Sequence, residues 1–243
     1  MKINCDMGES FGLWKIGQDS EIMPFIDMTN IACGMHASDP LVMHQTVALA
    51  KKYGVAIGAH PGYADLQGFG RRAMILPADE LQSLFIYQIG ALRAICHMQE
   101  TDIAYIKPHG ALYNKMMDDV FVYENLLIAL QKYDAQIPLM IMATPRREQY
   151  KKLADQYGIS LIFEAFVDRA YAPNGLLEPR SKKGASHKSL DKIKAQALSL
   201  IRDASVTTLD GQKLSVKADS LCIHGDGVLA LDIAQFLHGE LHK

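Results

Sequence analysis

Short apolar runs recur along the chain, and longer stretches with helical spacing of apolar residues lie between them. The length of the short runs favours β-strands over helices. We predict strands near residues 2–5, 28–32, 55–59, 103–106, 138–142, 159–163 and 220–223. We predict helices at about 40–53, 77–101, 111–132, 146–157, 188–204 and 227–238. Because strand and helix alternate about seven times, the pattern predicts parallel strands joined by right-handed crossovers.

Local signals support several of these boundaries. Asp39 suits the N-cap of a helix that begins at Pro40, and Gly54 suits its C-terminal end. Asp210-Gly211, between two apolar runs, predicts a small surface hairpin over residues 205–216.

Two long segments with several Gly and Pro residues, 61–76 and 167–187, break the alternation. Loops of this length in a compact domain are usually lids or mobile insertions. The chain has no internal repeat, low-complexity tract or linker, so we predict a single domain over residues 1–243.

Most of the predicted strands are followed closely by ionisable residues, which indicates an enzyme with one pocket. In a barrel of parallel strands the active site lies at the C-terminal strand ends. A closed barrel and an open, doubly wound sheet both fit the alternation. An open sheet concentrates its site at one switch point, so the wide spread of these clusters favours a seven-stranded parallel β/α barrel of the α/β class. The candidate site residues are Asn4, Asp6, Glu9, His36, His60, Arg71, Lys107, His109, Glu164, Asp168, Arg169, His224 and Asp226.

Four histidines, His36, His60, His109 and His224, form the strongest group. A single histidine is more often a packing residue, but four near strand ends are hard to assign to packing alone. Imidazole titrates near neutral pH and also binds metals as the neutral ring. The first three together with Asp6 are candidate ligands of a divalent metal. None of these four histidines belongs to an HExxH or HxxxH spacing, so this metal hypothesis depends on the fold alone.

The residues around the first and fourth strands have two interpretations each. Asp6 caps a turn, or it is a metal ligand or general base. Glu9 is a solvated loop acid, or it belongs to the site. Asn4 alternates with its neighbour in the strand and is placed to face the barrel interior. Lys107 is a solvated strand-end lysine, or it stabilises an oxyanion or holds a carboxylate.

Several cationic residues are candidates for binding an anion. Arg71 ends the first long loop, and its guanidinium suits a substrate carboxylate. Asp168 and Arg169 form an internal ion pair that shapes the second loop, or a base and its orienting partner. Asp226 is placed to hold the tautomer of the nearby imidazole. The basic run 180–183 is a solvated loop or an anion site.

Composition limits the class of protein. The chain has 243 residues, is 49% hydrophobic and has a formal net charge of −2, so it has enough apolar material for a large core. No basic face is implied, which argues against nucleic acid as a partner. No apolar stretch approaches the ~20 residues that cross a bilayer. The four cysteines form no CxxC pair, and the N-terminus has no signal-peptide pattern, so we expect a soluble cytoplasmic protein with reduced thiols.

Six motifs of the chain resemble those of the LamB/YcsF family, in the same order and over nearly the full length. The motifs are the segments 4–12 (NCDMGESFG), 30–40 (NIACGMHASDP), 58–72 (GAHPGYADLQGFGRR), 107–114 (KPHGALYN), 164–171 (EAFVDRAY) and 222–226 (CIHGD). Members of this family are the A subunits of a bacterial ATP-dependent 5-oxoprolinase.

The resemblance implies an irregular seven-stranded β/α barrel, similar to that of polysaccharide deacetylases. It also implies ring opening of 5-oxo-L-proline to L-glutamate, driven by ATP with Mg²⁺ and completed by partner subunits B and C. It leaves homo-oligomers open. The chain has no GxxxxGK[ST] and no strand-linked GxGxxG, so a partner is expected to perform or share the ATP step.

The resemblance also suggests roles for individual residues. Asp6 or a nearby histidine would activate water, and His60 and His109 would act as general acid and base. Lys107 would stabilise the oxyanion, and Arg71 or Arg169 would hold the substrate carboxylate.

Two other functions fit the residues. One is a stand-alone, metal-dependent amidohydrolase or deacetylase, which would work without ATP and be inhibited by a chelator. The other is a non-catalytic subunit that binds the substrate, whose ligand binding would survive replacement of all four strand-end histidines.

Overall fold

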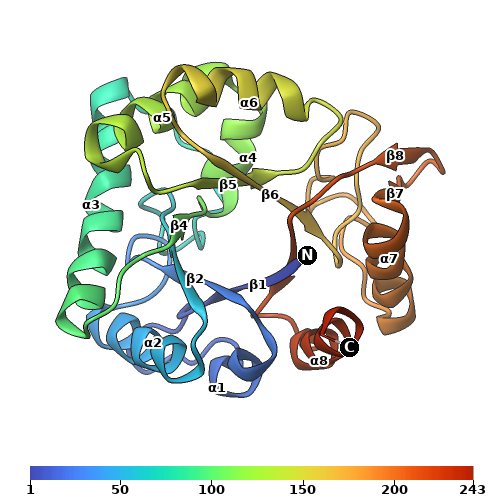
Figure 1. Ribbon diagram of the computed structural model, residues 1–243, viewed down its shortest axis with the longest axis horizontal. Coiled ribbons are helices and arrows are strands. Elements are labelled where there is room, and N and C mark those ends of the chain that lie inside the picture. Colours follow the sequence, from blue (N-terminus) through green and yellow to red (C-terminus); the bar gives the residue numbers. More distant parts are fainter. Residues whose placement is uncertain (243) are drawn as a thin grey trace.

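Seven parallel strands form a closed barrel in the computed structural model, which describes residues 1–242 (Figure 1). In order around the barrel they are β1 (Lys2–Met7), β2 (Met28–Ala32), β3 (Ala56–His60), β4 (Tyr105–Ile106), β5 (Leu139–Met142), β6 (Leu161–Phe166) and β9 (Ser220–His224). β9 pairs with both β1 and β6 and so closes the barrel. The predicted barrel class and all seven predicted strands are confirmed.

Helices surround the barrel (Figure 1). They are α1 (Asp19–Ile22), a 3₁₀ turn (Met23–Phe25), α2 (Pro40–Tyr53), α3 (Ala78–Met98), α4 (Gly110–Asp118), α5 (Val120–Asp134), α6 (Arg147–Gln156), α7 (Leu190–Asp203) and α8 (Ala230–Leu241). The prediction of one helix over 111–132 was wrong. Asp119 has extended backbone angles, and its carboxylate accepts a hydrogen bond from the Phe121 amide at 3.0 Å, so α4 ends there and α5 begins. The sequence pattern also missed α1, which is too short to show a helical period.

Other boundary predictions are confirmed. Asp39 accepts hydrogen bonds from the Leu41 and Val42 amides, Pro40 is the first residue of α2, and Gly54 ends it with φ +67°. β7 (Ser205–Thr207) and β8 (Lys213–Ser215) form the predicted antiparallel hairpin.

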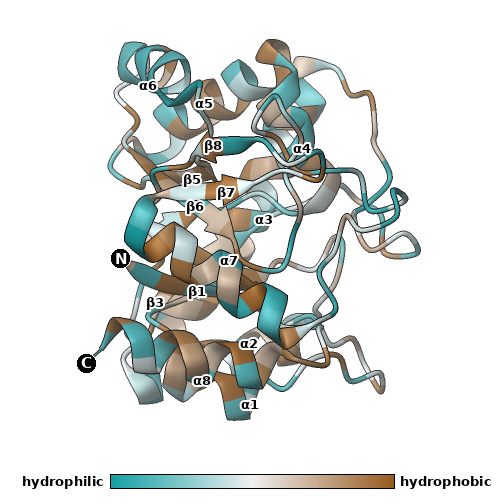
Figure 2. Ribbon diagram, turned by 90° about the vertical axis from the view of Figure 1, so that its right-hand side faces the viewer, coloured by the Kyte–Doolittle hydropathy of each residue, from teal (hydrophilic) through white to brown (hydrophobic). Residues whose placement is uncertain are grey.

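The two long loops, 61–76 and 167–187, contain no helix and no strand of the barrel. Loops project from the side of the barrel opposite the two chain ends (Figure 2). All four cysteines are free and buried. Within residues 1–242, no helix has both the length and the apolar character needed to cross a membrane.

Alternation along the strands creates two distinct environments. One set of side chains, including Ile3, Ile57 and Ile141, belongs to the large apolar core. The other set faces the barrel interior, where Met28, Tyr105 and Met140 form a small separate apolar cluster. Inward residues nearer the C-terminal strand ends are polar. These polar side chains supply the groups of the candidate site.

A chain of buried hydrogen bonds crosses the barrel interior above that cluster. Tyr105 Oη donates to Asn30 Oδ1 at 2.6 Å, and Asn30 Nδ2 donates to Asn4 Oδ1 at 2.8 Å. Asn4 Nδ2 donates to Ser220 Oγ at 2.9 Å. Asn4 therefore lies inside the barrel, as its place in the strand predicted. Because buried polar groups are costly unless paired, these contacts fix the relative placement of four strands.

Gly58 in β3 makes room for the Tyr105 ring, since a Cβ atom at this position would overlap it. We expect Gly58→Ala to destabilise the protein by about 1–3 kcal/mol through overpacking. Gly90→Ala is the matched control, because a Cβ there meets nothing within 4 Å and the residue lies within α3. The control is expected to gain up to about 1 kcal/mol from helix propensity. Urea unfolding of both variants measures these changes, and equal stability of the two would contradict this account of the barrel interior.

Candidate active site

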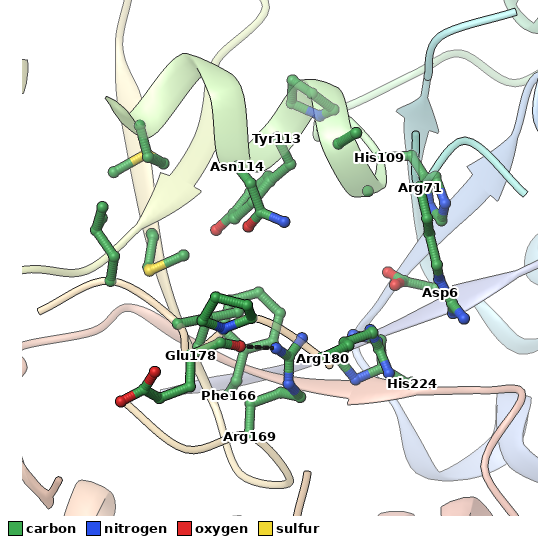
Figure 3. Close-up of a pocket in the computed structure, with 18 of the residues that line it drawn as sticks. Asp6, Arg71, His109, Tyr113, Asn114, Phe166, Arg169, Glu178, Arg180 and His224 are labelled. Carbon is green, nitrogen blue, oxygen red and sulfur yellow. Dashed lines mark hydrogen bonds between the residues drawn. The ribbon is translucent and has the colours of Figure 1, made fainter. Parts of the chain in front are cut away.

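A cavity of about 580 Å³ opens at the C-terminal ends of the strands. Side chains from opposite sides of the barrel meet in it, with Asp6 and Arg71 on one side and Phe166, Arg169 and Arg180 on the other (Figure 3). The predicted site residues that line the cavity are Asp6, Glu9, His60, Arg71, Lys107, His109, Arg169, His224 and Asp226. The remaining predicted residues, Asn4, His36, Glu164 and Asp168, contact this lining from behind.

A buried ion cluster forms the floor of the cavity. The Lys107 ammonium lies 2.9 Å from Asp6 Oδ1 and 3.1 Å from Glu164 Oε2, and all three residues are at most 5% exposed. Lys107 Nζ also lies 3.2 Å from Asn4 Oδ1 and 3.1 Å from Cys222 Sγ. The interpretation of Lys107 as a solvated lysine is therefore wrong, since its whole side chain points into the barrel.

The charges of this cluster stabilise one another. Burial alone would raise the pKa of Asp6, but the Lys107 ammonium and His60 outweigh it and hold that pKa well below its ordinary value. Burial alone would lower the pKa of Lys107, but the negative charge of Asp6, with Cys222 and Glu164, raises it well above its ordinary value. The cavity floor therefore presents a carboxylate and an ammonium at neutral pH.

His60 and His109 contact each other beside Asp6. His109 Nδ1 lies 2.9 Å from His60 Nε2, and His60 Nε2 lies 3.6 Å from Asp6 Oδ2. The outer nitrogens of the two rings each bond to a backbone carbonyl. His60 Nδ1 donates to the Lys107 carbonyl at 2.7 Å, and His109 Nε2 donates to the Phe69 carbonyl at 2.9 Å. Burial, followed by the charge of His60, lowers the pKa of His109 well below its ordinary value.

His36 stacks on His109, with ring centroids 3.7 Å apart and ring planes 2° from parallel. It is 1% exposed, and neither ring nitrogen has a hydrogen-bond partner within residues 1–242. Gly70 fits closely against both rings, since a Cβ there would lie 2.7 Å from His36 Cβ and 2.8 Å from His109 Cδ2. The glycines of loop 61–76 thus let the main chain approach the histidines.

The mouth of the cavity carries ion pairs that differ from the predicted ones. His224 Nδ1 lies 2.8 Å from Asp168 Oδ2, so Asp168 orients this imidazole, and the prediction that Asp226 does so was wrong. Asp226 instead accepts a hydrogen bond from Arg71 at 3.1 Å. The sequence could not predict this pairing, because Asp168 is 56 residues from His224, whereas Asp226 is the nearer acid along the chain.

Arg169 shapes the second long loop. Its guanidinium donates to the Glu178 carbonyl at 2.6 Å (Figure 3) and to the Ala185 carbonyl at 3.1 Å. Burial lowers its pKa to about 10. Arg169 is therefore an anchor of segment 167–187 more than a free cation, and it does not form the expected ion pair with its neighbour Asp168.

Arg180 is an exposed cation in the cavity lining, which favours the anion-site interpretation of the basic run over the solvated-loop one. The sequence analysis named the run that contains Arg180 but did not place this residue among the candidate site residues. It also missed Asn30, whose amide donates to Asp6 Oδ1 at 2.7 Å, and Tyr113 and Asn114, which point into the cavity from α4 (Figure 3). The signal for Asn30 was present, since a polar residue at an inward position of an apolar strand is rare unless paired.

Comparison with known proteins agrees with the motifs. The LamB/YcsF family matches residues 1–243. A protein of Vibrio campbellii, named as the A subunit of 5-oxoprolinase, is 49% identical, with 100% of this chain and 96% of that protein covered. A protein of the same name from Chromohalobacter salexigens is 50% identical over 92% of this chain and 90% of its own length.

A solved structure extends the similarity to three dimensions. The crystal structure of a lactam utilization protein from Thermus thermophilus has a TM-score of 0.89 and 38% identity, and the match covers 99% of this chain and 95% of that one. Sequence and fold are thus shared along the whole chain with relatives well above 30% identity. The chain therefore belongs to the LamB/YcsF family.

Proposed function

We propose that this chain is the A subunit of a 5-oxoprolinase, which opens the ring of 5-oxo-L-proline to give L-glutamate at the expense of ATP. Its partners in the reaction are subunits B and C. The observation that carries the proposal is one cavity that combines proton-transfer groups at its floor with arginines at its mouth, in a chain whose full-length relatives bear this name. The free, buried cysteines support a cytoplasmic location.

The substrate has two chemical ends that match the two ends of the cavity. Its lactam carbonyl oxygen is neutral and gains negative charge when it is phosphorylated, which suits the Lys107 ammonium at the floor. Its carboxylate is anionic and suits a guanidinium. Arg180 is the best candidate for this contact, because Arg71 pairs with Asp226 and Arg169 is held by backbone carbonyls.

An unstrained amide reacts slowly with water, so the ring needs activation. Transfer of the γ-phosphoryl group of ATP to the lactam oxygen would give an electrophilic carbon and release ADP. Water then adds to that carbon, the ring C–N bond breaks and the nitrogen takes a proton, which leaves an acyl phosphate. A second water hydrolyses this acyl phosphate to the glutamate carboxylate and inorganic phosphate. His60 and His109 are placed to accept the proton of water and return one to nitrogen, because their facing nitrogens lie next to Asp6.

ATP, with its Mg²⁺, is proposed to be bound largely by one of the partner chains. The chain has no phosphate-binding loop sequence. The cavity is larger than a single five-membered ring requires, which leaves room for a phosphoryl group delivered from outside.

A second candidate is ATP-independent hydrolysis of an amide by this chain alone. One specific observation favours it: Glu9, His36, His60 and His109 converge closely enough to hold a metal ion. The full-length relatives that carry the name of an oxoprolinase component favour the first candidate.

Reconstitution separates these candidates. We expect the chain, co-purified with subunits B and C, to release glutamate from 5-oxo-L-proline only when ATP is present, with ADP formed in equal amount. The chain alone is expected to release none. Glutamate release by the chain alone without ATP would replace the first candidate with the second.

Asp6→Asn tests whether this chain supplies catalytic groups. The substitution removes the carboxylate beside His60 and is expected to lower kcat of the three-subunit enzyme by about 100- to 10,000-fold. Asp155→Asn is the control, because Asp155 is an exposed acid on α6 paired with Lys151. Circular dichroism checks the fold of each variant, and His60→Gln is a second test if Asp6→Asn does not fold. Full activity in both pocket variants would make the chain a binding subunit.

Arg180→Gln tests the carboxylate contact. Loss of a charge-assisted hydrogen bond of about 1.5–3 kcal/mol would raise KM roughly 10- to 150-fold, with a smaller effect on kcat. The same variant is expected to handle 5-oxoprolinamide, which has no carboxylate, about as well as the wild type does. Lys183→Gln, in the same loop but outside the cavity lining, is the control. An equal loss for both substrates would assign the carboxylate contact to another residue.

A further inference from the structure

Four buried side chains converge above the barrel floor: Glu9, His36, His60 and His109. Each offers one ligand atom, and these atoms all lie within 4.8 Å of one another. The residues come from three loops or strand ends and from one strand, and each is at most 4% exposed. The fold therefore holds four largely buried ligand-type groups in one place, beside the cavity.

The hydrogen positions on two of the rings follow from their partners. A carbonyl oxygen only accepts hydrogen bonds, so His60 Nδ1 and His109 Nε2 must both carry hydrogen. In the neutral rings this leaves His60 Nε2 and His109 Nδ1 as bare lone pairs. These two acceptor atoms face each other at 2.9 Å. Two lone pairs at this distance repel unless a positive species lies between or beside them.

A proton and a metal ion are the two species that satisfy this arrangement, and the surroundings favour the metal. A proton shared by His60 and His109 would leave His36 with two buried, unpartnered nitrogens. It would also leave Glu9 Oε1 at 4.0 Å from His109 Nδ1, beyond hydrogen-bond distance. A cation among the four groups gives each of them a partner.

We propose that this cluster is a binding site for one divalent transition metal ion of the zinc type. The ligands are His60 Nε2, His109 Nδ1, a nitrogen of His36 and the Glu9 carboxylate. With the ion bound, the proton transfers proposed above for the two histidines fall to Asp6, whose Oδ2 lies 3.6 Å from His60 Nε2. Three imidazoles and one carboxylate suit zinc and its neighbours and not Mg²⁺ or Ca²⁺, which prefer oxygen. The Lys107 and Phe69 carbonyls act as supporting acceptors that fix the tautomers of the two rings.

The two facing nitrogens need only a small adjustment, whereas His36 must turn out of its parallel stack on His109, because an imidazole binds a metal in the plane of its ring. Tetrahedral zinc with Zn–N bonds near 2.0–2.1 Å places two ligand nitrogens about 3.3 Å apart. The two facing nitrogens at 2.9 Å would therefore separate by about 0.4 Å. Asp6 was an expected ligand, but its Oδ1 accepts hydrogen bonds from Lys107 and Asn30. Glu9 therefore replaces Asp6 in the ligand set. Asp6 Oδ2 lies next to the cluster, 3.6 Å from His60 Nε2.

Metal content tests the site without reference to turnover. The chain is purified without a metal-affinity column, stripped with a chelator, dialysed, and titrated with Co²⁺ and then Zn²⁺. We expect one equivalent of Co²⁺ to give the visible absorption of a tetrahedral site, and Zn²⁺ to displace it. We also expect Zn²⁺ to raise the melting temperature of the wild-type chain. Failure of the oxoprolinase assay would leave this outcome unaffected.

Variants locate the ion. His109→Gln and Glu9→Gln are each expected to weaken Co²⁺ binding by at least about 100-fold and to abolish the zinc-induced rise in melting temperature. His224→Gln is the matched control, because this histidine lines the same cavity but pairs with Asp168 outside the cluster. Absence of a stoichiometric metal in the wild type would overturn the proposal. So would unchanged binding in both ligand variants, or detection by ¹⁵N NMR of a proton shared between His60 and His109 in the presence of Zn²⁺.

Discussion

The need to compensate one buried ammonium organises the interior of this barrel. Lys107 carries its charge to a place that is almost free of water, where an unpaired charge would be very costly. Asp6 comes to it from β1 and Glu164 from β6, so one cation ties three strands together at the height of the cavity floor. Removing Lys107 would leave two carboxylates buried without compensation. The pairing of these three groups thus links the stability of the barrel to the charge at the floor of the cavity.

Much of the architecture could be predicted because it depends on local physics. Each strand is a short apolar run, and the helix from Pro40 carries its own cap and stop signals, so both are visible in the chain. The break at Asp119 was hidden because the apolar period continues through it, and only the geometry of the cap interrupts the helix. The strand-end position of the site was predictable for the same reason as the strands.

The partners within the site could not be predicted, because they depend on register and on loop paths. Asp6 meets Asn30 because β1 and β2 pair with these residues opposite each other. A shift of one residue would have turned Asn30 out of the barrel. His224 takes Asp168 and not the nearer Asp226, because the second long loop returns to the cavity mouth. Tertiary structure determines which of these side chains pair, and the sequence alone shows only which residue types are available.

The main chain at Phe69 has a wider consequence. This residue has φ +54°, in the left-handed region that non-glycine residues seldom occupy, and its carbonyl accepts the hydrogen of His109. The orientation of a buried imidazole in the cavity is thus set by a peptide group, which every amino acid possesses. Replacement of the Phe69 side chain leaves that acceptor in place, whereas a change in loop length would remove it.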